Sequence, residues 1–161
     1  MKSIFIGTTL ALSLLSMNAF AHDDEDNAVT GESHEGHAAT TGIAGNASKV
    51  SKTMEVNMND AMRFTPAILS IKRGETVKFV VKNTGKVKHE MVLGSIKELK
   101  EHAALMIKFP EMEHSDPNQV SVEPGKTGEL IWQFSKAGTF DFACLQPGHF
   151  EAGMRGNIVV K

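Results

Sequence analysis

From Thr53 onward the chain is a succession of short segments in which apolar and polar residues alternate, separated by turn residues. In one of them Val77, Phe79 and Val81 fall on one face, and lysines fall on the other. Successive side chains of a strand point to opposite faces, so this pattern is typical of half-buried strands. The segments concerned are 53–58, 63–71, 75–83, 88–94, 128–134, 138–144 and 156–161. They predict an all-β fold, an antiparallel β-sandwich with one core.

One segment between the strands has a helical pattern instead. In SIKELKEHAALMIKF, Ser95 precedes Glu98 by three residues, the spacing of a capping box at a helix start. The apolar residues at helical spacing are Ile96, Leu99, Ala103 and Met106. The segment predicts a single inserted α-helix that ends near Pro110.

The first 21 residues have the pattern of a cleaved signal peptide. Lys2 precedes an apolar region over residues 4–15, and Ala19 and Ala21 frame a small-x-small cleavage site. The apolar region is too short to span a bilayer, and no later segment is apolar enough to do so. We therefore expect a mature protein that begins at His22 and lies in the periplasm.

Residues 22–52 differ in composition from the rest of the chain. They hold no aromatic residue and few large aliphatic ones, so they cannot bury enough apolar surface to offset their ordering entropy. We expect a flexible acidic tail here and a folded domain over 53–161. His22, His34 and His37 lie in the tail among acidic residues. A solubilising linker is one interpretation of this segment. The other is metal capture, because these imidazoles and the free amine of His22 offer ligands for weakly bound copper(II).

Charge and cysteine content narrow the function. The net charge is −2, which gives no reason to expect a nucleic-acid partner. Cys144 is the only cysteine, so no internal disulfide can form. In an oxidising compartment an unpaired thiol is exposed to oxidation unless it is buried, catalytic or bound to a metal.

The stretch CLQPGHFEAGM, from Cys144 to Met154, collects a thiol, the His149 imidazole and a thioether. Cys144 continues the inward face of the preceding strand, and His89 lies on an inward face 55 residues earlier. Two imidazoles, one thiolate and one weak axial thioether form the ligand set of copper sites that transfer electrons. The residues therefore predict a metal site of His89, Cys144, His149 and Met154, with copper as the cofactor.

These residues resemble the cupredoxins, the family of type 1 blue copper proteins. The Cys144-x4-His149-x4-Met154 spacing, with His89 upstream, is similar to the copper loop of auracyanin. The stretch from His89 to Phe134 resembles exported bacterial cupredoxins linked to copper resistance. The resemblance covers residues 53–161 and implies a Greek-key β-sandwich of cupredoxin type with one inserted helix. One residue departs from the family pattern: Glu90 stands where the familiar members have an asparagine that braces the ligand loop.

The sequence leaves two further possibilities, a catalytic role for the Cys/His pair and a second copper site elsewhere in the chain. A Cys/His pair can be a nucleophile and its base, but no third orienting residue is evident and Cys144 ends a strand instead of starting a helix. Met106, Met112 and His114 offer a second, soft copper(I) site, although core packing is the commoner role of such residues.

The sequence thus predicts a periplasmic one-electron carrier with a role in copper tolerance, and not an enzyme. The alternative is a copper homeostasis protein in which electron transfer is secondary. We expect a monomer that meets redox partner proteins through the loop around His149.

Overall fold

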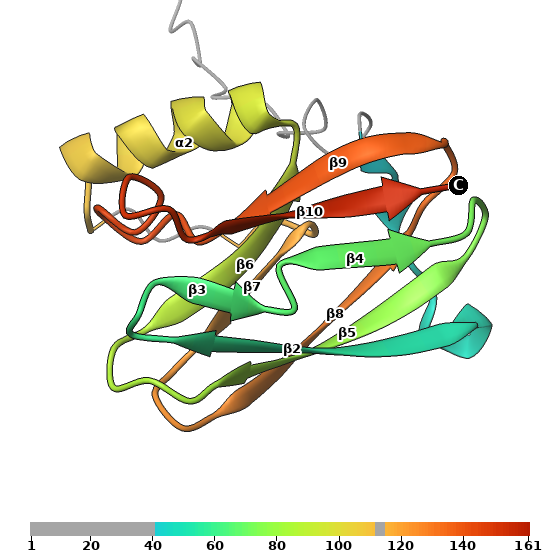
Figure 1. Ribbon diagram of the computed structural model, residues 1–161, viewed down its shortest axis with the longest axis horizontal. Coiled ribbons are helices and arrows are strands. Elements are labelled where there is room, and N and C mark those ends of the chain that lie inside the picture. Colours follow the sequence, from blue (N-terminus) through green and yellow to red (C-terminus); the bar gives the residue numbers. More distant parts are fainter. Residues whose placement is uncertain (1–40, 112–114) are drawn as a thin grey trace, which may run out of the picture. The chain divides into compact units, whose positions relative to one another are not determined.

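The alternating segments form two five-stranded β-sheets in the computed structural model, which describes residues 41–111 and 115–161 (Figure 1). Sheet A has the order β1 (Ile43–Ala44), β8 (Thr127–Gln133), β5 (Thr76–Asn83), β2 (Lys52–Asn59) and β3 (Arg63–Thr65). Sheet B has the order β4 (Ile68–Ile71), β10 (Arg155–Val160), β9 (Gly138–Ala143), β6 (His89–Gly94) and β7 (Gln119–Val122). The predicted two-layer β fold is therefore confirmed.

The sheets are mixed, whereas the alternation pattern predicted an antiparallel sandwich. β2 pairs with β5 in parallel, and β4 pairs with β10 in parallel. The predicted strand 63–71 is in fact two strands, since β3 pairs with β2 and β4 crosses to the other sheet. Because the chain passes through sheet B before it returns, β5 enters sheet A beside β2 in the same direction.

The core lies between the sheets and uses the predicted inward faces. Val77, Phe79 and Val81 of β5 are buried, and so are Leu130 and Trp132 of β8. Cys144, His89 and Met154 are buried within or beside this same core. The sandwich therefore excludes water from three of the four predicted ligands.

The predicted helix is α2 (Ile96–Lys108), and both halves of its capping box are formed. α2 lies along β6 and β9, on the side of sheet B that faces away from sheet A (Figure 1). Leu99, Ala103 and Met106 pack against it, but Ile96 is 45% exposed, contrary to the helical pattern. Because α2 covers one side and the core the other, every residue of β6 is buried.

The folded part of the chain begins before Thr53, where the sequence placed its start. Ile43 and Ala44 of β1 pair with β8, and a 3₁₀ turn, η1 (Ala47–Lys49), follows. The Trp132 indole Nε1–H donates to the Thr41 carbonyl at 3.3 Å. β1 has only two residues, which is too short for an alternation of apolar and polar residues to predict a strand. β7 was missed for a similar reason, being four residues long.

The predicted signal peptide and residues 22–40 of the predicted tail, with Met112 and His114, lie outside the described residues. Within the described part, no helix is both long and apolar enough to cross a bilayer.

Candidate metal centre

The secondary structure brings four predicted ligands to one end of the sandwich. His89 is the first residue of β6, and Cys144 follows the last residue of β9. β6 and β9 are neighbours in sheet B, so the two side chains lie close together although they are 55 residues apart in the sequence. His149 lies in the loop after Cys144, and Met154 directly precedes β10.

Three donor atoms of this cluster form a compact triangle. The Cys144 Sγ lies 3.2 Å from the His149 Nδ1 and 3.9 Å from the His89 Nδ1, and the two Nδ1 atoms are 3.2 Å apart. The point equidistant from these three atoms lies about 2.0 Å from each, near the roughly 2.0–2.3 Å of metal bonds to His nitrogen and Cys sulfur. The three side chains therefore fit a single metal ion without rearrangement.

Backbone hydrogen bonds close the ligand loop. The Cys144 N–H donates to the Met154 carbonyl at 3.0 Å, and the Met154 N–H donates to the His149 carbonyl at 3.0 Å. Gly148 and Gly153 have φ of +82° and +89°, which β-carbon-bearing residues rarely adopt. The Met154 side chain is fully buried in the same cluster as Cys144. The loop thus holds three of the predicted ligands in a short closed turn.

The Cys144 thiol lies in an apolar setting that contains two backbone donors. The Glu90 N–H donates to its Sγ at 3.4 Å, and the Gln146 N–H also donates to it. Burial nevertheless raises the pKa of Cys144 to about 12, because the sulfur is shielded from water. The thiol therefore stays protonated at neutral pH until a metal displaces the proton.

The Cys/His hydrolase alternative does not fit this setting. An activated cysteine has a lowered pKa and is partly exposed, whereas Cys144 is fully buried and its pKa is raised. The same burial suits a metal ligand, whose thiolate forms only when the metal binds.

The two imidazoles differ in their surroundings. His89 is fully buried, and its Nε2 lies 3.2 Å from the Asp60 Oδ1. His149 is partly exposed and directly follows the exposed residues Pro147 and Gly148. Desolvation, followed by the neighbouring His89, lowers the pKa of His149. His149 therefore stays neutral, and able to bind a metal, to a lower pH than a free imidazole does.

Glu90 braces the ligand loop, the role that the resemblance gives to an asparagine in the familiar members. Its Oε1 accepts from the Leu145 N–H at 3.0 Å, and its Oε2 accepts from the Ser121 hydroxyl at 3.2 Å and the Gln146 amide at 3.3 Å. The side chain thus ties β6 and β7 to the two residues that follow Cys144 in the ligand loop. Sequence reasoning noted this position only as a departure from the family.

The other predicted metal sites gain no support here. Met106 is buried in the apolar cluster between α2 and sheet B. Its proposed partners Met112 and His114, and the histidines of the tail, lie outside the described residues. Asp60 was missed altogether, since no local pattern links it to His89, 29 residues later.

The raised pKa of Cys144 predicts how the metal-free protein responds to alkaline pH. The folded pKa of about 12 exceeds the ordinary value of 9.0, so the unfolded chain releases this proton first. The stabilisation is complete below pH 9, and we expect it to be lost as the pH rises towards 12. Urea unfolding of the metal-free protein from pH 8 to 11 measures this loss. Cys144→Ser is the control, and identical pH profiles for the two proteins would contradict the prediction.

Comparison with known proteins finds copper-binding relatives. The model of a family described as copper binding proteins, plastocyanin/azurin family, matches residues 50–161. A copper-resistant cuproprotein CopI from Rubrivivax gelatinosus is 52% identical over 136 residues, which cover 81% of this chain and 82% of that protein. The CopI protein of Vibrio cholerae is 36% identical, covering 92% of this chain and 94% of its own.

Solved structures show the same fold at low sequence identity. Reduced auracyanin from Roseiflexus castenholzii superposes with a TM-score of 0.59 at 19% identity, covering 70% of this chain and 98% of that one. An azurin from Methylomonas sp. strain J gives a TM-score of 0.52 at 20% identity, covering 70% and 99%. These matches confirm the predicted cupredoxin sandwich.

Proposed function

Because this chain belongs to the plastocyanin/azurin family of copper-binding proteins, we propose that it holds one type 1 copper ion and carries single electrons in the periplasm. The proposed ligands are His89, Cys144 and His149, with Met154 as the weak axial ligand. The observation that carries the proposal is the triangle of donor atoms, whose centre lies about 2.0 Å from each of them.

The surrounding residues suit a carrier. Copper, when bound, supplies a one-electron couple, and a mixed sulfur and imidazole set accommodates both oxidation states. Once a metal displaces the thiol proton, the N–H groups of Glu90 and Gln146 would stabilise the negative charge on the Cys144 sulfur. The hydrogen bonds that join Cys144, His149 and Met154 hold the ligands in place, so that little rearrangement accompanies electron transfer.

Exposure of the ligands supports a carrier over an enzyme. His89, Cys144 and Met154 are fully buried, which leaves a substrate no path to the metal through them. His149 is the one proposed ligand that is partly exposed, and it follows the exposed residues Pro147 and Gly148. We expect electrons to enter and leave through the His149 ring, to partner proteins that dock on the loop of a monomeric protein.

Copper tolerance is the second role that we propose. The similar proteins from Rubrivivax gelatinosus, Pseudomonas aeruginosa and Vibrio cholerae are each named copper-resistant cuproprotein. A buried site with a thiolate and a thioether retains Cu(I) tightly, which suits both electron transfer and sequestration. The two roles differ in how many copper ions the protein binds.

Copper stoichiometry with a visible spectrum tests this proposal. We expect the protein purified from the periplasmic fraction to bind one copper ion, with an intense sulfur-to-copper absorption band and a reversible one-electron wave. A truncation that begins at Thr41 is the matched control, since it keeps β1 and removes the His-bearing segment. Several copper ions, lost on truncation, would favour sequestration. One copper ion without the intense band would contradict the type 1 assignment.

A further inference from the structure

We propose that Asp60 is a positioning residue for the metal centre: its carboxylate holds His89 in the metal-binding tautomer and lowers the reduction potential. This inference rests on the proposed function, because it requires His89 to be a ligand. It assigns a role to a residue that no sequence pattern identified.

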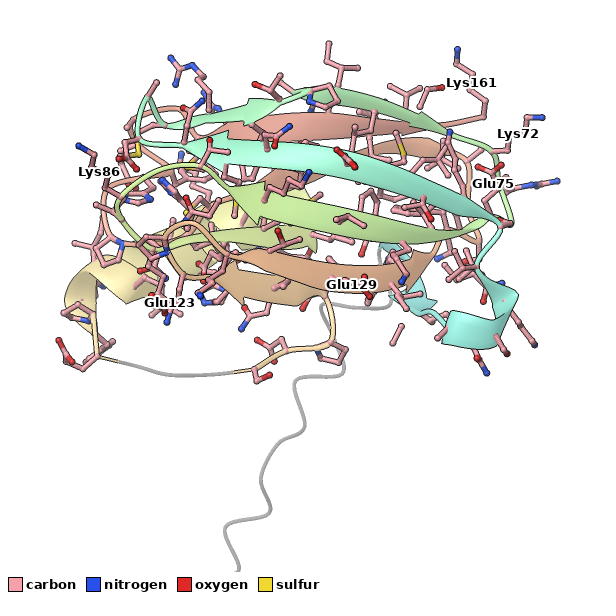
Figure 2. All side chains as sticks on the ribbon, turned by 90° about the horizontal axis from the view of Figure 1, so that it is seen from below. Lys72, Glu75, Lys86, Glu123, Glu129 and Lys161 are labelled. Carbon is pink, nitrogen blue, oxygen red and sulfur yellow. The ribbon has the colours of Figure 1, made fainter. Side chains whose placement is uncertain are left out.

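Asp60 lies just after β2 and is held in place by the loop that precedes His89. Its Oδ2 accepts from the Lys86 N–H at 2.8 Å, and its Oδ1 accepts from the Val87 N–H at 3.4 Å. The same Oδ1 lies 3.2 Å from the His89 Nε2. Figure 2 shows Lys86 at one end of the sandwich, with Lys72 and Lys161 at the other. The carboxylate is therefore fixed at the end of the fold where the metal centre lies.

The hydrogen bond to Asp60 decides which nitrogen of His89 is free. An ionised carboxylate only accepts hydrogen bonds, so the Nε2 must carry the proton and donate it. In the neutral ring the Nδ1 then bears the lone pair, and this atom faces Cys144 and His149. A ligating histidine is commonly oriented in this way by a carboxylate on its other nitrogen.

Gly85 provides the space that the carboxylate occupies. A Cβ at this position would overlap the Asp60 Oδ1 and lie 2.8 Å from its Cγ. The backbone at Gly85 does not have a positive φ, so conformation does not demand glycine here. The Gly85 N–H donates to the Asn83 Oδ1 at 2.9 Å, and Asn83 also donates to the Val87 and Val122 carbonyls. A buried asparagine thus fixes the loop against the carboxylate.

The charge of Asp60 acts unequally on the two oxidation states. A carboxylate on the outer nitrogen makes the imidazole a stronger donor. It also attracts the extra positive charge of Cu(II). The buried His89 ring excludes water from the space between the carboxylate and the metal, whereas the outer side of the carboxylate faces water, since the Asp60 side chain is 39% exposed. Cu(II) is therefore stabilised more than Cu(I), and the potential falls.

Three variants separate the charge from the hydrogen bond. Asp60→Asn keeps an oxygen that accepts from the Nε2 but removes the charge, and Asp60→Ala removes both. Gly85→Ala keeps the charge but displaces the carboxylate from His89. Glu55→Gln is the matched control, because it removes a carboxylate that lies on β2 five residues before Asp60 and pairs with Lys82 at 3.6 Å instead of with a proposed ligand.

We expect Asp60→Asn to bind one copper ion with the intense band retained, and to lose about tenfold in its preference for Cu(II) over Cu(I). For one electron this is a rise of about 59 mV in the potential. Asp60→Ala and Gly85→Ala should shift it in the same direction, and Glu55→Gln should match the parent protein. Nitrogen NMR of the metal-free parent protein should find the proton of His89 on Nε2. The same measurement on metal-free Asp60→Ala should find a mixture of the two tautomers.

The outcomes distinguish this inference from the proposed function. If the parent protein has the type 1 spectrum but Asp60→Asn, Asp60→Ala and Gly85→Ala keep its potential and its tautomer, the role of Asp60 is wrong and the copper site stands. If the parent protein binds no copper in this cluster, both proposals are overturned. Should Asp60→Ala fail to fold, Asp60→Asn and Gly85→Ala still decide the result.

Discussion

The Cys144→Ser variant should lose the intense visible band entirely while it remains a folded β protein. The band requires a thiolate bound to copper, and a serine hydroxyl does not ionise at neutral pH. The fold should persist, because the serine oxygen can still accept from the N–H groups of Glu90 and Gln146 that now reach the sulfur. The loss of a residue that hydrogen-bonds to a metal ligand lowers metal affinity by up to roughly 100-fold. Because Cys144 is itself a proposed ligand, the affinity for Cu(I) should fall by more than this.

The measurements are the visible spectrum, copper titration with a competing chelator, and circular dichroism of the metal-free variant. Thr139→Ser on β9 is a suitable control, since residue 139 is exposed on the strand that leads to Cys144. The control should keep both colour and affinity. A Cys144→Ser protein that stays blue would refute the assignment of this thiol, and with it the proposed function.

Replacement of Glu90 by alanine should have the largest effect on stability among the residues around the ligands. Its side chain is 4% exposed and accepts hydrogen bonds from the Leu145 N–H, the Gln146 amide and the Ser121 hydroxyl. The variant leaves the Leu145 N–H buried without an acceptor, which by itself costs about 1–3 kcal/mol. With the other two bonds lost, we expect the free energy of unfolding to fall by about 3 kcal/mol.

Denaturant unfolding of the metal-free protein measures this effect, and the copper spectrum reports the position of the loop. Glu123→Ala is the matched control, because Glu123 forms an exposed ion pair with Lys88 at 3.4 Å, and such a pair contributes about 0–1 kcal/mol. Glu90→Gln should lie between the two, since one oxygen can still accept from Leu145. Equal losses for Glu90→Ala and Glu123→Ala would show that Glu90 does not brace the loop.

Several features follow from residues that are close together in the chain. The alternation in β5 and β8 predicted which side chains form the core, because strand periodicity repeats every two residues. Ser95 and Glu98 predicted the start of α2, because a capping box involves one helical turn. Cys144, His149 and Met154 were identified together because one loop carries all three.

Other features depend on which strands become neighbours. The stretch 63–71 has one pattern but supplies β3 to one sheet and β4 to the other, and β1 pairs with β8 through residues assigned to the tail. Asp60 and His89 meet because the loops after β2 and β5 lie at the same end of the sandwich. The ligand loop, the helix start and the buried faces could be predicted from the amino-acid order alone, since each depends on contacts within a few residues. The parallel strand pairs, the partner of His89 and the acceptor role of Glu90 could not be predicted in this way. Those contacts join segments that are tens of residues apart, and these segments pair only when the whole core is buried.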